Sequence, residues 1–181
     1  MSIKTDDKEM MKSLADPVQA RKAFEQVVSR YSEPLYWKIR RIVVDHDDAN
    51  DVLQNTFLKA WRSIGDFRQE SKLSTWLYRI AINESLDFVR REQKMRNMDG
   101  DVSLATRLVA DNYFDSDQTQ ALLQEAIATL PDVQRTVFNL KYFDEMKYSE
   151  MSKLMGVTEG ALKASYHIAV KKITAYVQRH E

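Results

Sequence analysis

The chain has 181 residues, and 27 lysines and arginines balance 27 aspartates and glutamates to give a formal net charge of zero. A free-standing DNA-binding protein usually carries a strong basic excess, so zero net charge argues against that class. The absence of cysteine excludes disulfides, cysteine zinc sites and thiol nucleophiles. No stretch has the apolar character of a signal peptide or a membrane span, and we therefore expect a cytoplasmic protein.

The first part of the chain predicts helices after a short leader. The sequence leaves open whether residues 1–19 are ordered. Asp16 followed by Pro17 is typical of a helix N-cap and first turn. Apolar residues then recur at helical spacing from Phe24 to Tyr31 and again from Leu35 to Val43. These two stretches predict core helices that are either consecutive or antiparallel.

A strongly amphipathic helix is predicted from Asp48 to Trp61. Its apolar stripe includes Trp61, and Gly65 is expected to cap its C-terminus. The opposite face carries acidic and amide side chains at Asp48, Asp51, Gln54 and Asn55. This face fits a solvated, well-capped helix surface. It equally fits a ridge that docks a basic partner helix, with Leu58 as an exposed apolar anchor.

The next helix is expected to start at Ser74 or Thr75 and to run to about Arg91. The preceding loop, residues 65–73, is polar apart from Phe67 and Leu73. Single-stranded DNA recognition needs aromatic rings for bases, amides for base edges and cations for phosphates. Side chains of these kinds occur along the loop and helix at Phe67, Trp76, Arg79, Asn83 and Arg90, and the spacing places Asp87 on the same face as Asn83 and Arg90. Trp76 also fits a place in the core.

Charged residues are sorted along the chain. Cations outnumber acids between Trp76 and Arg96 and again from Lys147 onward, whereas residues 97–118 hold five aspartates against Arg107 alone. No segment alternates as a strand would. We therefore predict an all-α fold of two small helical domains, residues 20–96 and 119–181, joined by an acidic linker at residues 97–118.

The C-terminal domain is predicted to contain a helix-turn-helix. A helix stops at Leu130, and the next restarts at Asp132 after a proline. Gly156 then separates two amphipathic stretches, and Thr158 is placed to cap the second. The rotation that buries the apolar face of the second helix turns these residues outward: Thr158, Glu159, Lys163, Ala164 and His167.

Outward side chains of this second helix suit a major groove. Glu159 can accept a hydrogen bond from cytosine, and Lys163 can donate to guanine or to a phosphate. Lys171 suits a phosphate contact, and Gly160 permits close approach of the helix N-terminus to the DNA backbone. A solvated polar surface is the alternative interpretation.

Four segments together resemble a known family. They are residues 48–61, 74–83, 130–138 and 156–163, and in this order they resemble the extracytoplasmic-function subgroup of bacterial sigma factors. The resemblance covers the chain from about Ala20 to Arg179 except for the linker. It implies a two-domain initiation factor that binds core RNA polymerase and directs it to promoters.

The resemblance also implies roles for individual residues. The ridge would dock on the coiled-coil clamp helices of the largest polymerase subunit through Asp48, Asp51, Gln54, Asn55 and Leu58. The melted minus-ten element would lie near Phe67, Trp76, Arg79, Asn83, Asp87 and Arg90. The minus-thirty-five element would meet Arg135, Thr158, Glu159, Gly160, Lys163, Ala164, His167 and Lys171. An anti-sigma protein is a further expected partner, and no enzyme activity, metal or cofactor is expected.

The chain departs from the family at several positions. Many relatives have arginines where this chain has Ser165, Ile168 and Val170, which changes the phosphate contacts of the second domain. Ile82 replaces a frequent basic residue, and Asn50 and Asn55 stand where acids are common. Promoter sequence therefore does not transfer from relatives.

Two other classes compete with a sigma factor. One is a free-standing helix-turn-helix regulator. The other is an enzyme, because His46 and Asp47 resemble the metal-binding pair of phosphohydrolases. However, the only other histidines are His167 and His180, far along the chain.

Overall fold

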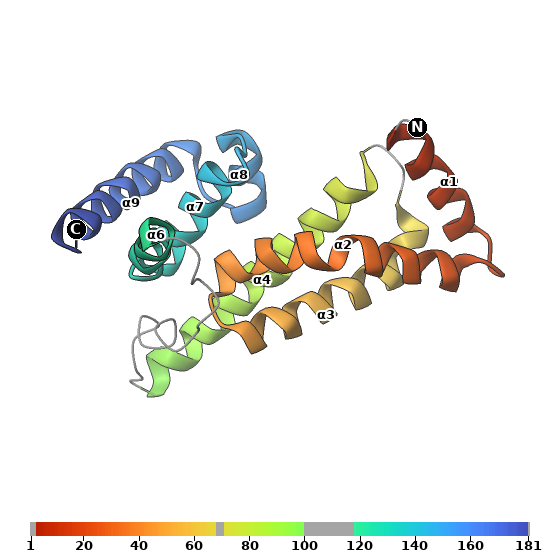
Figure 1. The fold of residues 1–181 in the computed structure, drawn as a ribbon, viewed down its shortest axis with the longest axis horizontal. Coiled ribbons are helices and arrows are strands. Elements are labelled where there is room, and N and C mark those ends of the chain that lie inside the picture. The colour runs from red at the N-terminus through yellow and green to blue at the C-terminus, as the bar shows by residue number, and fades with distance from the viewer. Residues whose placement is uncertain (1–2, 68–70, 100–117, 181) are drawn as a thin grey trace. The chain divides into compact units, whose positions relative to one another are not determined.

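The computed structural model describes residues 3–67, 71–99 and 118–180, and its regular elements are all helical (Figure 1). This confirms the predicted all-α fold. The chain divides into two compact units. One comprises Met1–Arg40 with His46–Ser85, and the other comprises Arg41–Asp45 with Leu86–Glu181. The boundaries predicted at residues 96 and 119 stay predictions.

The N-terminal segment contains a helix, α1, Ile3–Ala15. Met11 and Leu14 of this helix are buried. Asp16 caps the turn that leads into the next helix, as its pairing with Pro17 predicts, and its carbonyl oxygen accepts a hydrogen bond from the Ala20 N–H at 2.7 Å. Its carboxylate accepts a hydrogen bond from the Val18 N–H at 2.9 Å, which closes a turn before α2 begins at Ala20.

Helix α2 runs without interruption over Ala20–Val43, so the two predicted core stretches are consecutive parts of one helix. Pro34 lies inside α2 on its exposed side. Buried Val27, Leu35 and Ile39 give the helix its core face. Val44 then adopts a φ of 79°, an uncommon conformation for a β-branched residue, and the chain enters α3 two residues later.

Helix α3, His46–Ser63, is longer than predicted at both ends. Gly65 does not cap it in the left-handed conformation but lies within a short 3-10 helix, η1, Ile64–Asp66. After α3 the backbone therefore continues into a 3-10 turn and does not end at a left-handed glycine. The Lys59 ammonium donates to the Glu84 carboxylate at 2.6 Å, which ties α3 to α4.

Helix α4, Leu73–Asp99, begins just before the predicted capping residues and continues well past Arg91. The first three residues of the predicted linker, 97–99, therefore belong to this helix. Residues 100–117 of that linker lie outside the described residues. Leu77 and Ala81 are fully buried on one face of α4, which leaves the opposite face available for binding.

Four helices build the C-terminal part of the second unit: α6 (Gln118–Ala128), α7 (Asp132–Tyr142), α8 (Tyr148–Met155) and α9 (Glu159–His180). Leu130 and Phe138 join Ala169 and Ile173 of α9 in a buried apolar cluster. The long helix α9 thus packs against α6, α7 and α8.

The turn between α8 and α9 has the geometry that the sequence predicted. Gly156 adopts a φ of 68°, in the left-handed region that ends many helices. The Thr158 hydroxyl oxygen accepts a hydrogen bond from the Ala161 N–H at 3.3 Å and so caps α9. Together these two residues set the helix-turn-helix.

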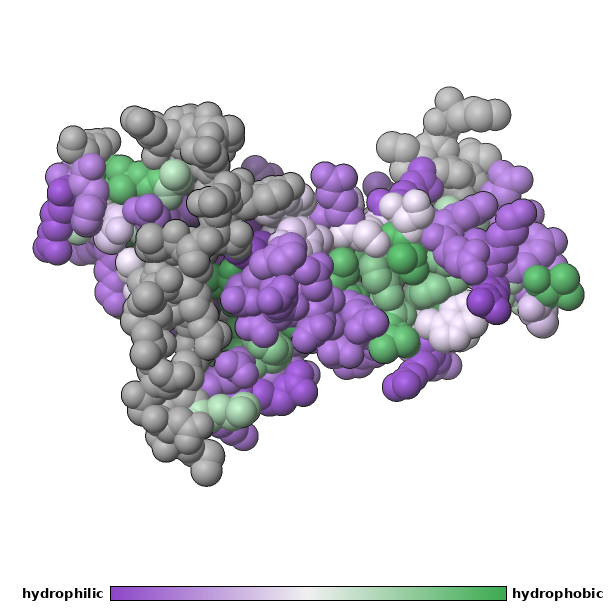
Figure 2. Space-filling model, turned by 60° about the horizontal axis from the view of Figure 1, so that its bottom comes forward, coloured by the Kyte–Doolittle hydropathy of each residue, from purple (hydrophilic) through white to green (hydrophobic). Residues whose placement is uncertain are grey.

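The described residues contain no helix long and apolar enough to cross a membrane. Hydrophilic side chains cover most of the face seen in Figure 2, and hydrophobic side chains form smaller patches among them.

Candidate functional site

The polar ridge predicted on α3 is present as an exposed surface. Asp51, Gln54 and Asn55 lie along the outer side of α3, and Asp48 is half-buried near the helix start. The Leu58 side chain is 49% exposed at the end of this ridge. Acids in the first turn also suit the positive end of the helix dipole, so charge and fold agree here.

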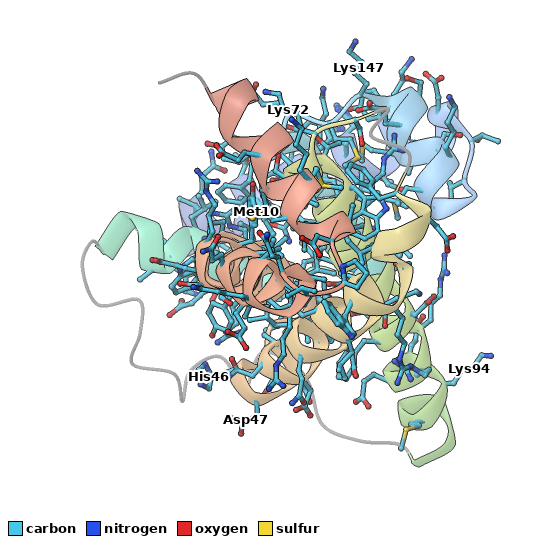
Figure 3. The ribbon with its side chains drawn as sticks, turned by 90° about the vertical axis from the view of Figure 1, so that its right-hand side faces the viewer. Met10, His46, Asp47, Lys72, Lys94 and Lys147 are labelled. Carbon is cyan, nitrogen blue, oxygen red and sulfur yellow. The ribbon has the colours of Figure 1, made fainter. Side chains whose placement is uncertain are left out.

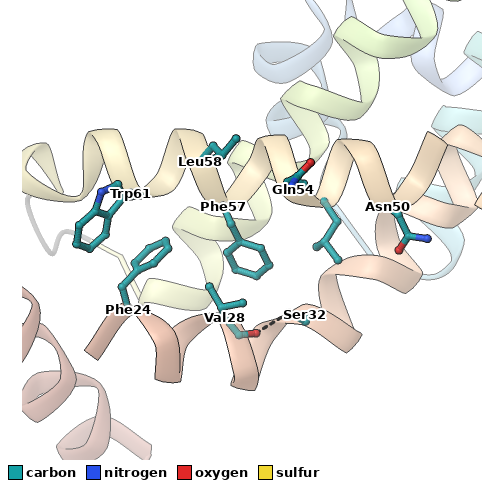
Figure 4. Close-up of a pocket in the computed structure, with 9 residues that line it drawn as sticks. Phe24, Val28, Ser32, Asn50, Gln54, Phe57, Leu58 and Trp61 are labelled. Carbon is teal, nitrogen blue, oxygen red and sulfur yellow. Dashed lines mark hydrogen bonds between the residues drawn. The ribbon is translucent and has the colours of Figure 1, made fainter. Parts of the chain in front are cut away.

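An apolar groove adjoins the ridge between α2 and α3 (Figure 4). It encloses about 380 Å³, and Gln54 and Leu58 belong to both the ridge and the groove. Phe24 and Trp61 close one end, with their ring centroids 4.9 Å apart. The sequence pattern places Trp61 in the core stripe, but it is 42% exposed. Periodicity alone could not separate a core tryptophan from one at a groove.

The predicted nucleic-acid surface of α4 gathers on one face of that helix. Arg79, Asn83, Asp87 and Arg90 are all exposed. Trp76, near the helix start, is half-buried, and the centroid of its ring lies 5.0 Å from that of Phe67, with the ring planes at 40°. The loop and the helix thus share an aromatic pair at one end of this polar face.

Arg90 and Asp87 also interact with each other. The Arg90 guanidinium lies 3.4 Å from the Asp87 carboxylate, and both side chains are more than half exposed. Such a surface pair is weak, typically below about 1 kcal/mol, so a polyanion can displace it. Arg79 and Lys94 add further exposed cations on α4, and Figure 3 labels Lys94.

The second helix of the helix-turn-helix, α9, exposes the predicted DNA-facing side chains. Five of the named positions follow a single solvent-facing side of the helix: Gly160, Lys163, Ala164, His167 and Lys171. Thr158 and Glu159 are exposed at its N-terminus. The arrangement provides backbone N–H groups at one end and cations along the length, both suited to phosphates.

Lys163 is positioned by an aromatic ring of α8. Its ammonium lies 5.7 Å from the ring centroid of Tyr148, and Lys141 of α7 lies 5.1 Å from the same ring. Burial, followed by the charge of Tyr166, raises the pKa of Tyr148. A neutral phenol therefore remains beside the two cations at ordinary pH.

Arg135 does not share this exposure. Its side chain is 2% exposed, and its guanidinium donates to the Asp132 carboxylate at 2.7 Å and to the Leu130 carbonyl at 3.1 Å. The predicted contact with the minus-thirty-five element requires an exposed cation. In this structure the N–H groups of the Arg135 guanidinium instead donate to acceptors within the protein. One clue was present in the sequence, since Asp132 stands three residues before Arg135 on one helix.

His46 and Asp47 lie at the start of α3. Among the described residues, no three histidines, cysteines or carboxylates stand close enough together to hold a metal. The two ring nitrogens of His46 instead meet the Tyr36 hydroxyl at 2.7 Å and the Asn50 amide at 3.2 Å. His46 thus joins α2 to α3 at the start of α3, where Figure 3 labels it beside Asp47.

Comparison with protein families accounts for both parts of the chain. Residues 27–95 match the family described as Sigma-70 region 2, and residues 120–173 match Sigma-70, region 4. The ridge, the groove and most of α4 fall in the first match. The helix-turn-helix falls in the second.

Characterised relatives are similar along most of their length. The ECF RNA polymerase sigma factor SigW of Bacillus subtilis is 31% identical over 156 residues, which cover 80% of this chain and 83% of that protein. The RNA polymerase sigma-H factor of Pseudomonas aeruginosa is 30% identical over 169 residues, which cover 87% and 88%.

Solved structures share the fold. The sigma factor RpoE from Bartonella quintana, solved with the anti-sigma factor NepR, has a TM-score of 0.64 at 24% identity, covering 87% of this chain and 98% of that one. CnrH, solved with the cytosolic domain of CnrY, has a TM-score of 0.61 at 22% identity, covering 97% and 99%.

Proposed function

Since this chain belongs to the extracytoplasmic-function subgroup of RNA polymerase sigma factors, and so directs core polymerase to promoters, we propose that its three exposed surfaces divide that work. The α3 ridge binds the polymerase, the α4 face binds melted DNA, and the α9 face binds duplex DNA. The observation that carries this assignment is that each surface is exposed on a helix of the matching family region.

The α3 ridge is the proposed polymerase contact. Asp48, Asp51, Gln54 and Asn55 present acceptors to a basic helix, and Leu58 adds an apolar anchor beside the groove. The partner would be the clamp helices of the largest subunit. Acidic and amide groups at the rim of an apolar groove favour orientation and fast association.

The α4 face is the proposed contact to the melted minus-ten element. Phe67 and Trp76 supply rings for an unstacked base, Arg79 and Arg90 supply cations for phosphates, and Asn83 can hydrogen-bond a base edge. Asp87 holds Arg90 until DNA arrives.

The α9 face is the proposed contact to the minus-thirty-five element. Lys163 and Lys171 neutralise phosphates or meet guanine, and Glu159 accepts from cytosine. Thr158, Gly160, Ala164 and His167 complete the surface. We leave Arg135 out of the direct contacts in this conformation, because its guanidinium is buried against Asp132.

An anti-sigma protein and the cytoplasm are the proposed partner and site of action. Two structural neighbours were solved with other proteins bound, one of them the anti-sigma factor NepR, and an anti-sigma protein is a proposed partner here as well. The family consists of DNA-binding initiation factors, so we propose no enzyme activity. The proposed site of action is the cytoplasm, where the polymerase and the chromosome are found.

Pull-down with core polymerase, followed by run-off transcription on genomic fragments, tests the whole proposal. The expected result is a stable complex that initiates at a defined set of promoters. A gel shift without polymerase, at physiological salt, is the opposing test. Tight specific binding in that assay, together with no complex with core enzyme, would favour a free-standing regulator.

A further inference from the structure

An exposed isoleucine lies on the cationic helix α9. Ile168 is 42% exposed, although it sits among Lys163, Lys171 and Lys172 on a helix whose remaining surface is largely polar. Ala164 precedes it by four residues, which places both on the same side of the helix, and Ala164 is also exposed. The two methyl-bearing side chains form a small apolar strip between cations.

The positive charge of α9 indicates which kind of partner covers the apolar strip of Ala164 and Ile168. Besides Glu159 at the first position of α9, every charged side chain described on this helix is cationic or a histidine. A polyanion is the complementary partner, and duplex DNA also presents an apolar group in its major groove. That group is the C5-methyl of thymine, which alanine and other apolar side chains contact.

We propose that Ile168, with Ala164 one turn before it, is a specificity-determining residue that contacts a thymine methyl group in the upstream promoter element. This inference rests on the proposed role of α9. The polar side chains of α9 do not account for this contact. Ile168 would favour an A·T over a G·C base pair at the position that it contacts. Lys163 and Lys171, in contrast, act on phosphates or guanine.

The test uses the full chain bound to core polymerase. A duplex library randomised upstream of a fixed minus-ten region is first selected with this holoenzyme. Each thymine in the enriched element is then replaced singly by deoxyuridine, which removes only the C5-methyl. We expect one replacement to weaken binding about four-fold, the value of one buried methyl group.

Two variants assign the effect to Ile168. In I168A the loss at that thymine should disappear, because the methyl no longer has a partner. V170A is the matched control: Val170 is 37% exposed on the same helix, but about 200° away at 100° per residue, and the loss should persist. Thermal melting of both variants checks that α9 remains folded.

The failures are distinguishable. An enriched element without thymine, or deoxyuridine effects that I168A leaves unchanged, would overturn the role of Ile168 alone. If the holoenzyme forms but enriches no upstream sequence, the proposed role of α9 fails as well. If no holoenzyme forms, the proposed function itself is wrong.

Discussion

The ring of Trp76 lies 5.0 Å from the ring of Phe67, so the start of α4 and the loop after η1 share one aromatic pair. Replacing Phe67 with alanine removes the loop partner and leaves Trp76 in place. We expect promoter melting to fall about ten-fold with little change in polymerase binding, because base stacking is worth about 1–3 kcal/mol. Permanganate reactivity of thymines in the minus-ten region measures melting.

The variant F67L separates stacking from apolar packing. It keeps a large side chain against Trp76 but offers no ring to a base. If F67L melts promoters as well as the unaltered chain does, then the ring of Phe67 does not bind an unstacked base.

Reversing the charge of Asp51 tests the α3 ridge. D51R places a cation on the ridge that we propose to bind a basic helix of the polymerase, and we expect affinity for core polymerase to fall at least about ten-fold, since like charges oppose each other across such an interface. E9R, at an exposed glutamate of α1, is the control for the same charge change elsewhere. Fluorescence titration with labelled chain measures both affinities, and equal binding by D51R and E9R contradicts the ridge assignment.

The helix-turn-helix was predictable from sequence because its signals are local. Gly156 can adopt a positive φ without a steric cost, and the hydroxyl oxygen of Thr158 caps α9, the helix that follows it. Both residues act on backbone within a few positions of themselves. The polar faces of α3, α4 and α9 followed from the same kind of reasoning, since helical periodicity assigns a side to each residue.

Other features depended on packing that a single sequence does not display. Met11 and Leu14 of α1 are buried, which the sequence around them does not indicate. Trp61 has the spacing of a core residue, yet it remains partly exposed beside Phe24. Arginine is rarely buried, so a sequence does not predict that Arg135 is. Arg135 is buried because the fold brings the Ile42 and Leu130 carbonyl oxygens to its guanidinium.

Removing one partner of the buried pair between Arg135 and Asp132 should lower the stability of the protein strongly. Asp132 is 9% exposed, and D132A leaves the Arg135 guanidinium buried without that carboxylate. We expect the free energy of unfolding to fall by about 3–5 kcal/mol. K59A breaks the pair of Lys59 with Glu84, in which Lys59 is 55% exposed, and should cost below about 1 kcal/mol. Urea denaturation compares the two, and equal losses would contradict the difference in burial.

Two glycines should respond in opposite directions to the same substitution. Gly156 has a φ of 68° and open space where a Cβ atom would lie, so G156A costs backbone strain alone, roughly 1–2 kcal/mol. Gly160 is helical and equally uncrowded, so G160A should raise stability by about 0.5 kcal/mol. The added methyl at residue 160 should nevertheless weaken upstream DNA binding, because the backbone then approaches phosphates less closely. Thermal melting and holoenzyme footprinting separate the two effects.

The ring of Tyr148 should act on DNA binding through Lys163, whose ammonium lies 5.7 Å from its centroid. Y148A removes the ring from beside Lys163 and should weaken upstream DNA binding about two- to five-fold, the size of a cation–π contact near 0.5–1 kcal/mol. Y148F keeps the ring and should bind as the unaltered chain does. The contact that the structure shows is made by the ring, over which both ammonium groups lie, and not by the hydroxyl. Filter binding of the holoenzyme to a duplex upstream element tests both variants, and a loss of equal size in Y148F would transfer the role from the ring to the hydroxyl.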